Sequence, residues 1–225
     1  MPNGSLTTAR GAHGPAPAEA TPDAPAFNPF DDRTGAAHRG REVIRNPSVA
    51  EIMQPGDLPE MALGRADAPV VLIKYMSLTC PYCRQFQLET FPALKRDYID
   101  PGKMRFILRE FPIGFQSGAA TVALRCAPPN KSFALYEMFL TDQRSWVGQE
   151  VRLDPIFRIA TKVGITREQF DACFKNQSTI AALKRIKERG RTLGIVGTPN
   201  FFVNGTLVKS VLTLPEIRAM ITRER

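Results

Sequence analysis

Two cysteines separated by two residues, Cys80 and Cys83, are the side chains of this sequence best suited to chemistry. Thiols at this spacing can close an internal disulfide or exchange it with another molecule. They follow residues 70–75, a β-branched and aliphatic run that is typical of a strand buried on both faces. A helix that begins directly after this strand would point unpaired N–H groups and its positive dipole end at the Cys80 sulfur. Cys80 is therefore the expected nucleophile, and Cys83, one turn further on, the resolving thiol.

Three neighbouring residues belong to the same candidate site. Pro81 suits the first position of the helix, where its missing backbone donor would go unused. Tyr82 offers a thiolate at most a neutral hydrogen-bond donor. Lys74, six residues before Cys80, either places an ammonium beneath the site or extends along the strand end into solvent. Both interpretations of Lys74 stay open.

Other uses of a CxxC pair fit this sequence less well. A c-type haem site requires a histidine directly after the second cysteine, where Arg84 stands. A zinc site requires further ligands at recognisable spacing, but the two histidines, His13 and His38, lie near the N-terminus. A purely structural pair is disfavoured because the cysteines stand where a strand passes into a helix. We expect no cofactor and no metal.

Charge and hydropathy exclude two further classes of function. The net charge of +8 and the pI near 9.6 would suit a nucleic-acid-binding protein, but lysines and arginines after residue 60 are dispersed among acids. We therefore expect no nucleic-acid partner. No stretch approaches the roughly 18 apolar residues of a membrane-spanning helix, so we expect no membrane span.

Composition divides the chain into three parts. Residues 1–45 are rich in Ala, Pro, Gly, Thr and Asp without periodic apolar positions, which predicts a disordered tail. Residues 46–62 are predicted to be a linker with a short helix that is capped near Ser48. Residues 63–225 are predicted to form one domain, with the folded sequence proper beginning near Leu63.

The order of elements in that domain predicts an α/β fold. The strand before Cys80 is followed by a helix, which Pro92 should kink or restart, and by a second, parallel strand over residues 103–110. Short helices with their own start signals then form an inserted subdomain over about residues 115–193. Two antiparallel strands joined by Asn204 and Gly205, and a last helix, complete the order βαβ, helices, ββα.

Three features together resemble the DsbA-like branch of the thioredoxin superfamily, across about residues 63–225. They are the CPYC motif after a buried strand, the helical insertion, and Gly197-Thr198-Pro199 before the closing hairpin. The resemblance implies a thioredoxin-like fold and a protein disulfide oxidoreductase. It also implies that Pro199 is a cis-proline facing the two cysteines, and that the backbone of Thr198 presents an edge to extended substrate peptides.

Two departures from that family bear on the direction of exchange. Disulfide-oxidising relatives often carry Pro-His between the cysteines, whereas Pro81-Tyr82 also resembles glutaredoxins and isomerase-like relatives. Many relatives have an acid at the position of Lys74, and an ammonium cannot act as a carboxylate base. We expect an oxidase that introduces disulfides through the Cys80 and Cys83 pair. A reductase or isomerase, or a redox-sensing or metal-handling thiol protein, stays an alternative.

The other two cysteines, Cys126 and Cys173, lie on apolar faces of predicted helices and should point into the subdomain. Two inert buried thiols or a structural disulfide would both fit that placement. The similarity to paired positions in relatives favours the disulfide.

The resemblance also implies partners and a compartment. We expect protein or peptide thiol and disulfide substrates, and a redox partner that reoxidises or reduces the chain. Trimeric relatives use a long helical N-terminal stalk, and because this Pro-rich N-terminus shows no heptads, a monomer is expected. The resemblance implies the periplasm or cell envelope. No secretory signal is visible in residues 1–45, which leaves a cytoplasmic protein or a mis-set start open.

Overall fold

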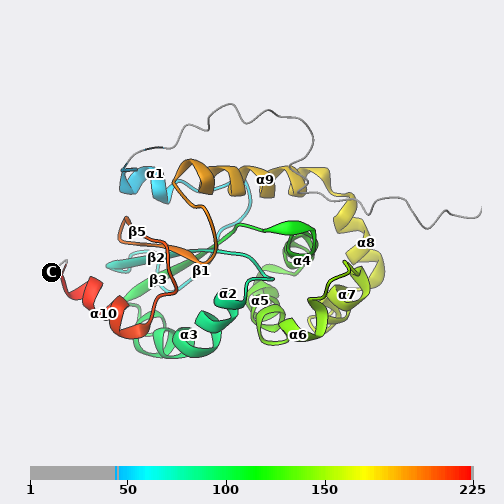
Figure 1. The fold of residues 1–225 in the computed structure, drawn as a ribbon, viewed down its shortest axis with the longest axis horizontal. Helices are drawn as coiled ribbons and strands as arrows, with labels where there is room; N and C mark the ends of the chain where they lie inside the picture. The colour runs from blue at the N-terminus through cyan, green and yellow to red at the C-terminus, as the bar shows by residue number, and fades with distance from the viewer. Residues whose placement is uncertain (1–43, 45, 224–225) are drawn as a thin grey trace, which may run out of the picture.

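The structure, a computed structural model, describes residue 44 and residues 46–223. The predicted tail over residues 1–45 therefore lies, except for residue 44, outside the described residues. At the centre is a five-stranded mixed sheet with the strand order β1-β3-β2-β4-β5 (Figure 1). The strands are β1 (Met61–Leu63), β2 (Val70–Met76), β3 (Met104–Glu110), β4 (Asn200–Val203) and β5 (Thr206–Val208).

The register of the sheet confirms the predicted α/β class. Strands β2 and β3 run parallel, and β4 pairs antiparallel with both β2 and β5. Asn204 and Gly205, which join β4 to β5, both have positive φ, as a tight two-residue hairpin turn requires. Because β2 has a partner on each side, it is buried throughout most of its length and can hold the residues that follow it in place.

One face of the sheet is covered by the helical connection between β2 and β3 and by the last helix, below the sheet in Figure 1. The connection alternates α-helix and π-helix. A π-helical turn ends at Thr90 and a new α-helical turn begins at Phe91 with Pro92 in its first positions, which agrees with the predicted restart of the helix at this proline. These elements are α2 (Pro81–Gln85), η1 (Phe86–Thr90), α3 (Phe91–Leu94), η2 (Lys95–Ile99) and α10 (Leu214–Arg223).

The opposite face is covered by α1 (Val49–Met53) and α9 (Gln177–Thr192), which run along the upper side in Figure 1. Ile52 of α1 is 1% exposed and packs with Ile73, Tyr75 and other residues of the sheet. Helix α9 lies so close to the sheet that a Cβ atom at Gly190 would stand 2.8 Å from the ring of Tyr75. Glycine is therefore the residue that fits at this crossing.

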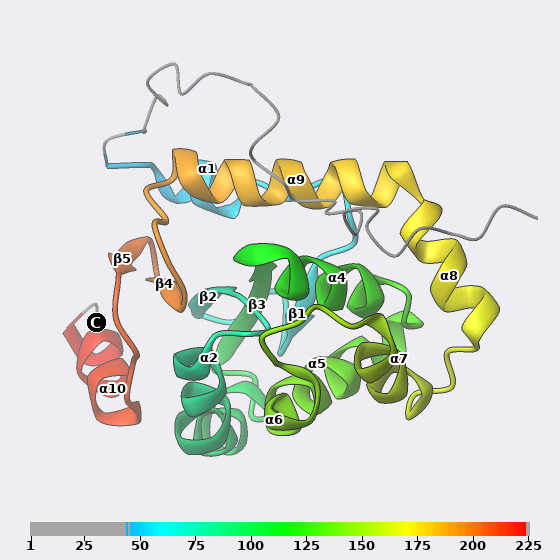
Figure 2. The same cartoon turned by 45° about the vertical axis from the view of Figure 1, so that its right-hand side comes forward.

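The remaining helices form a subdomain at one end of the sheet, and α9 leads from it back along the sheet (Figure 2). Phe170 and other residues of this subdomain share one apolar core with the face of the sheet that α2, α3 and α10 cover. Its elements are α4 (Gly114–Arg125), η3 (Pro129–Lys131), α5 (Ser132–Thr141), α6 (Gln143–Trp146), α7 (Leu153–Thr161) and α8 (Arg167–Lys175).

The packed structure begins earlier than the sequence pattern predicts. Strand β1 pairs antiparallel with β3 before the expected start of the domain, and α1 is docked on the sheet. Arg109 of β3 donates to the carbonyl oxygens of Ile52 and Gln54 at 2.7 Å and 3.2 Å. Arg189 of α9 donates to the carbonyl oxygen of Glu51 at 2.9 Å. Within the described residues, no helix is both long and apolar enough to cross a membrane.

Candidate active site

Cys80 is the N-cap residue of α2, at the point where the chain leaves the buried strand β2. Its backbone is extended, with φ −75° and ψ 120°, and its sulfur accepts the N–H of Cys83 at 3.4 Å. Pro81 occupies the first turn of the helix, where a missing N–H costs no hydrogen bond. The free N–H groups of the helix start therefore face the Cys80 sulfur.

The surroundings of Cys80 stabilise its thiolate. A hydrogen bond from the Cys83 thiol is the largest cause that lowers the pKa of Cys80, to about 6. The side chain of Thr198 and the N–H groups of Cys83 and Tyr82 also lower this pKa, while partial burial opposes them. A thiol with this pKa is mostly ionised at neutral pH and can attack a disulfide.

Cys83 behaves in the opposite way. Its side chain is 0% exposed, and burial raises the pKa of this thiol well above its usual value. The two cysteines, three residues apart, are thus one partly exposed nucleophile and one buried thiol that must lose a proton before it can react. This asymmetry is what a nucleophilic and a resolving thiol require.

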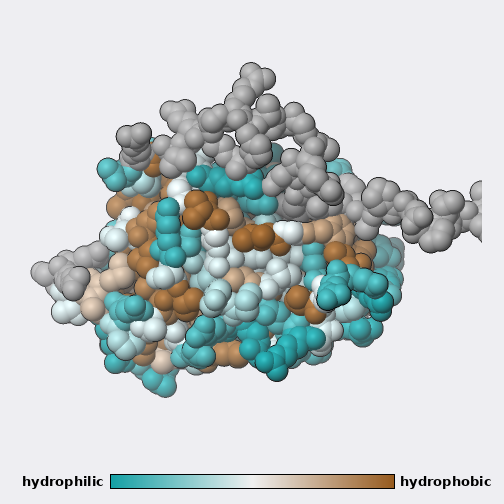
Figure 3. All heavy atoms as spheres, in the orientation of Figure 1, coloured by the Kyte–Doolittle hydropathy of each residue, from teal (hydrophilic) through white to brown (hydrophobic). Residues whose placement is uncertain are grey.

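The segment before β4 forms the other wall of the site. The peptide bond between Thr198 and Pro199 is cis, and the carbonyl oxygen of Thr198 lies 3.1 Å from the Cys80 sulfur. A groove of about 390 Å³ runs beside it, lined by Tyr82, Val196, Gly197, Thr198, Pro199, Asn200, Lys209, Ser210 and Val211. Tyr82 and Val196 are 59% and 77% exposed. Figure 3 shows apolar surface on the face where the segment between α9 and β4 runs.

Lys74 lies inside the protein, so the interpretation that it extends into solvent is wrong. Its side chain is 0% exposed, and its Nζ donates to the carbonyl oxygen of Cys83 at 3.3 Å and to the Tyr136 hydroxyl at 3.0 Å. Nζ also stands 4.5 Å from the centre of the Phe86 ring. Burial lowers the pKa of Lys74 to about 8, although the nearby cysteines act to raise it.

Polar residues of the helical subdomain hold the loop between β2 and α2. Gln143 of α6 donates to the carbonyl oxygens of Leu78 and Cys80 at 2.7 Å and 3.2 Å. The hydroxyl of Ser117 in α4 accepts the N–H of Leu78 at 3.2 Å and bonds the hydroxyl of Ser77 at 2.7 Å. Sequence reasoning missed Gln143, Ser117 and Tyr136, because a polar residue on a distant helix carries no local motif.

The structure thus gathers Lys74, Cys80, Cys83, Thr198 and Pro199 with the intervening Pro81 and Tyr82 at one site. Cys126 and Cys173 lie elsewhere, between the C-terminus of α4 and helix α8, and their sulfurs are joined at 2.00 Å. Among the described residues, no group of three or more His, Cys, Asp or Glu side chains is arranged to hold a metal ion.

The chain is similar to several known proteins. It is 30% identical over 165 residues to a Rickettsia conorii protein provisionally named a protein-disulfide oxidoreductase, covering 72% of this chain and 60% of that one. It is 29% identical over 156 residues to a Bacillus anthracis protein provisionally named disulfide bond formation protein D, covering 66% and 71%. The chain therefore spans about 60% of the length of the Rickettsia relatives it matches.

The solved structure of Wolbachia pipientis alpha-DsbA1 superimposes with a TM-score of 0.71 at 27% identity, covering 78% of this chain and 95% of that one. A family model described as Thioredoxin matches residues 57–223, which include the site and the whole sheet. The chain belongs to the thioredoxin family, in its DsbA-like branch.

Proposed function

We propose that the chain is a thiol-disulfide oxidoreductase that introduces disulfides into protein substrates through Cys80 and Cys83. The observation that carries this proposal is the asymmetry of the pair. Cys80 is partly exposed with a pKa near 6, whereas Cys83 is buried with a raised pKa. Such a pair forms a mixed disulfide through one sulfur and releases it through the other.

The direction of exchange follows from which form of the pair is stabilised. Interactions that favour the Cys80 thiolate stabilise the reduced protein, and a stabilised reduced form makes the disulfide form a stronger oxidant. The buried Lys74 acts in the same sense when it is protonated, because its charge lowers the pKa of Cys83. An oxidase that is reoxidised by a redox partner fits these charges better than a reductase does.

The reduction potential tests the direction. We expect equilibration with glutathione to give a potential between about −120 and −180 mV, the range of disulfide donors. A potential near −270 mV is that of a reductant and would contradict the direction while leaving the exchange chemistry intact.

The roles of the two cysteines are tested by trapping. Cys83→Ser should attack a peptide disulfide through Cys80 and accumulate the mixed disulfide as one peptide thiolate leaves, whereas Cys80→Ser should form none, because only Cys80 has both exposure and a lowered pKa. Mass mapping identifies the adduct, and Ser145→Ala, at an exposed position of α6, is the control. An adduct on Cys83 would reverse the assignment.

The compartment is proposed to be the periplasm or cell envelope. A structural disulfide persists in oxidising compartments and is rare in a reducing cytosol, and the structure holds one between Cys126 and Cys173. Rapid acid quenching of cells, followed by alkylation, should find these two thiols blocked. Free thiols at both positions in intact cells would argue for a reducing compartment.

A further inference from the structure

The amine of Lys74 is buried without an anionic partner. Its hydrogen bonds go to a carbonyl oxygen and a phenol hydroxyl, and an aromatic ring covers it. Within the part of the chain that the structure describes, no carboxylate pairs with Lys74. A buried ammonium without a counter-ion costs several kcal/mol, so structures rarely keep one without a use for it.

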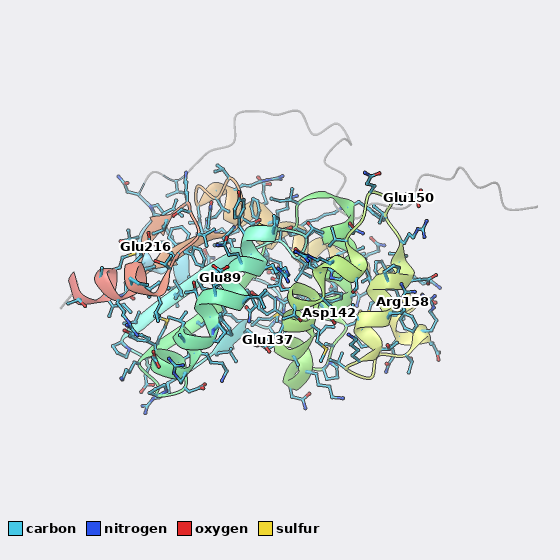
Figure 4. All side chains as sticks on the ribbon, turned by 60° about the horizontal axis from the view of Figure 1, so that its bottom comes forward. Glu89, Glu137, Asp142, Glu150, Arg158 and Glu216 are labelled. Carbon is cyan, nitrogen blue, oxygen red and sulfur yellow. A yellow bond between two sulfur atoms is a disulfide. The ribbon has the colours of Figure 1, made fainter. Side chains whose placement is uncertain are left out.

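The titratable groups around Lys74 are few. The charges of Cys83 in α2 and of Cys80 at its N-cap act to raise the pKa of Lys74, and Tyr136 of α5 accepts a hydrogen bond from it. Glu110, on β3, pairs with Arg125. Glu137 follows Tyr136 on α5, and burial raises its pKa while the nearby charge of Lys95 acts to lower it. Figure 4 shows Glu137 and Glu89 of η1 on the face turned toward the viewer. The anion that can form beside Nζ is thus a cysteine thiolate of the active site.

We propose that Lys74 carries the proton of Cys83 during exchange, and that Tyr136 positions its amine for this transfer. The inference rests on the proposed function, because it concerns the resolving step of that reaction. The ammonium form of Lys74 gives a proton to Cys83, and its neutral amine form takes the proton back.

The steps balance as follows when the enzyme oxidises a substrate. A substrate thiolate attacks the Cys80 sulfur of the Cys80–Cys83 disulfide, the bond between the two sulfurs breaks, and Cys83 leaves as a thiolate. The Lys74 ammonium protonates that thiolate and becomes a neutral amine. A second substrate thiolate then attacks the substrate sulfur of the mixed disulfide, and Cys80 leaves as a thiolate.

Reoxidation reverses the proton transfer. The Cys80 thiolate attacks a disulfide of the redox partner, and a mixed disulfide forms as one partner thiolate leaves. The neutral amine of Lys74 takes the proton of the Cys83 thiol, and the resulting thiolate attacks the Cys80 sulfur. The Cys80–Cys83 bond forms and the second partner thiolate leaves, so two electrons have passed to the partner.

Burial explains why Cys83 needs such a group. Its side chain has no exposed surface, so hydroxide and buffer bases do not reach it. The Tyr136 hydroxyl is also fully buried, and burial raises its pKa well above the usual value, so it stays protonated and holds the amine by a hydrogen bond. General-base catalysis by a positioned group contributes about 10²- to 10⁴-fold.

The test measures the two halves of the exchange separately. The probe is a short peptide disulfide, whose attack by Cys80 and release by Cys83 are each followed by rapid acid quenching. Lys74→Met should slow release by about 10²- to 10⁴-fold, while attack by Cys80 changes less than about threefold, since Cys80 owes its low pKa to other groups. Lys103→Met, at an exposed position, is the matched control.

Three further variants separate a base from a fixed charge and from a structural role. Lys74→Arg keeps a charge but cannot accept a proton, so release should stay slow, and a normal rate would overturn the proposal. Tyr136→Phe should slow release about three- to tenfold, the size of one hydrogen bond, and shift its pH profile. Tyr98→Phe is the control, and an unshifted profile in Tyr136→Phe would remove the positioning role.

The wild-type protein provides a test that involves no substitution. The rate of peptide release should rise with pH and level off where the Lys74 amine loses its proton. That titration is read by lysine nitrogen NMR on reduced protein alkylated at Cys80, which mimics the mixed disulfide. The proposal predicts that the midpoint of the release rate and the midpoint of the Lys74 titration fall at the same pH. A release rate that instead rises with ionisation of the Cys83 thiol at higher pH overturns it. If Cys80 forms no mixed disulfide, the proposed function itself fails.

Discussion

Cys80 and Cys83 carry the same chemical group, and their different positions on one helix turn make them unlike. Cys80 caps the helix and faces free N–H groups, whereas Cys83 lies in the core beneath it. The helix start stabilises negative charge on the first sulfur, and the apolar surroundings oppose it on the second.

The lowered pKa of Cys80 predicts how stability depends on pH. The folded reduced protein releases this proton near pH 6 and the unfolded chain near pH 9. Since the unfolded state binds more protons between these values, this group adds stability as pH rises from about 6 to 9, and the contribution is lost as pH falls through 6. In denaturant unfolding, the free energy of unfolding of the reduced wild type should increase relative to that of Cys80→Ala as the pH rises from about 6 to 9.

The control for this prediction is the oxidised protein, in which neither sulfur titrates and the pH-dependent gain should vanish. Ultraviolet absorbance of the thiolate gives the midpoint directly. A midpoint near 9 in the reduced protein would contradict the effect of the helix start.

Sequence reasoning reaches some residues of the site and not others. The CPYC motif and Gly197-Thr198-Pro199 are local signals, and the structure brings Cys80 and Thr198 into contact. The position of Lys74 was visible, but its burial depends on α5, which packs over it from another part of the chain. Tyr136 could have been found only from that packing.

At the scale of elements, the loop between β2 and α2 is held from outside the βαβ unit. Ser117 of α4 satisfies the N–H of Leu78 and the hydroxyl of Ser77, and Gln143 of α6 satisfies two carbonyl oxygens. The helical subdomain therefore fixes the backbone that carries Cys80. This gives the insertion a role in the geometry of the site.

We expect Ser117→Ala to lower the free energy of unfolding by about 1–3 kcal/mol, because it leaves the buried N–H of Leu78 without an acceptor. The measurement is denaturant unfolding of the oxidised protein. Ser145→Ala removes a hydrogen bond at an exposed position and should lower the free energy of unfolding by less than about 0.5 kcal/mol. Equal losses in the two variants would show that the hydrogen bond between Ser117 and Leu78 stabilises the protein no more than an exposed one does.

The disulfide between α4 and α8 should stabilise the subdomain. It spans a separation of 47 residues, for which chain entropy predicts about 4 kcal/mol. The double variant Cys126→Ala with Cys173→Ala should lose about this much in thermal or denaturant unfolding. It should keep the Cys80 pKa, since the pair lies apart from the site. A lost thiolate signal at Cys80 would indicate coupling between subdomain and site.

Short elements are those that the sequence predicts least well. The predicted strands over residues 70–75 and 103–110 correspond to β2 and β3, because long buried runs have a strong pattern. Strand β1 has three residues, too few for a visible alternation. It is fixed by its pairing with β3 and by Gly64, where a Cβ atom would stand 2.2 Å from the carbonyl oxygen of Met104.

At the scale of the whole molecule, arginines of the domain hold the segment that precedes β1. Arg109 donates to two carbonyl oxygens of this segment and Arg189 to a third, while Arg125 donates to that of Pro59 at 2.7 Å. Arg185 pairs with Asp57. These contacts attach residues 51–59 to β3, α4 and α9.

The monomeric state and the identity of the redox partner stay predictions.

Arg109→Met should release this segment. The substitution removes the donor of the buried carbonyl oxygen of Ile52, of the partly buried one of Gln54 and of the Tyr75 hydroxyl. The free energy of unfolding should therefore fall by about 1–3 kcal/mol. Hydrogen exchange should speed up in residues 49–63 more than in β2. Arg96→Met, at an exposed ion pair, is the control. Equal acceleration in both regions would mean that the arginine supports the sheet as a whole.

The pairing of Cys80 with the Thr198 carbonyl joins residues 118 positions apart. A ribosome adding about 5–20 residues per second makes the second roughly 6–24 s after the first. Throughout that interval the nascent chain carries Cys80 and Cys83 without β4, and Cys126 is made well before Cys173, its partner. Before Cys173 is made, an oxidant can join Cys126 of the growing chain only to Cys80 or Cys83, from which the finished protein keeps it apart. Correct pairing of Cys126 therefore requires its oxidation to wait until α8, which carries Cys173, is synthesised, so this chain itself depends on the kind of exchange that is proposed for it.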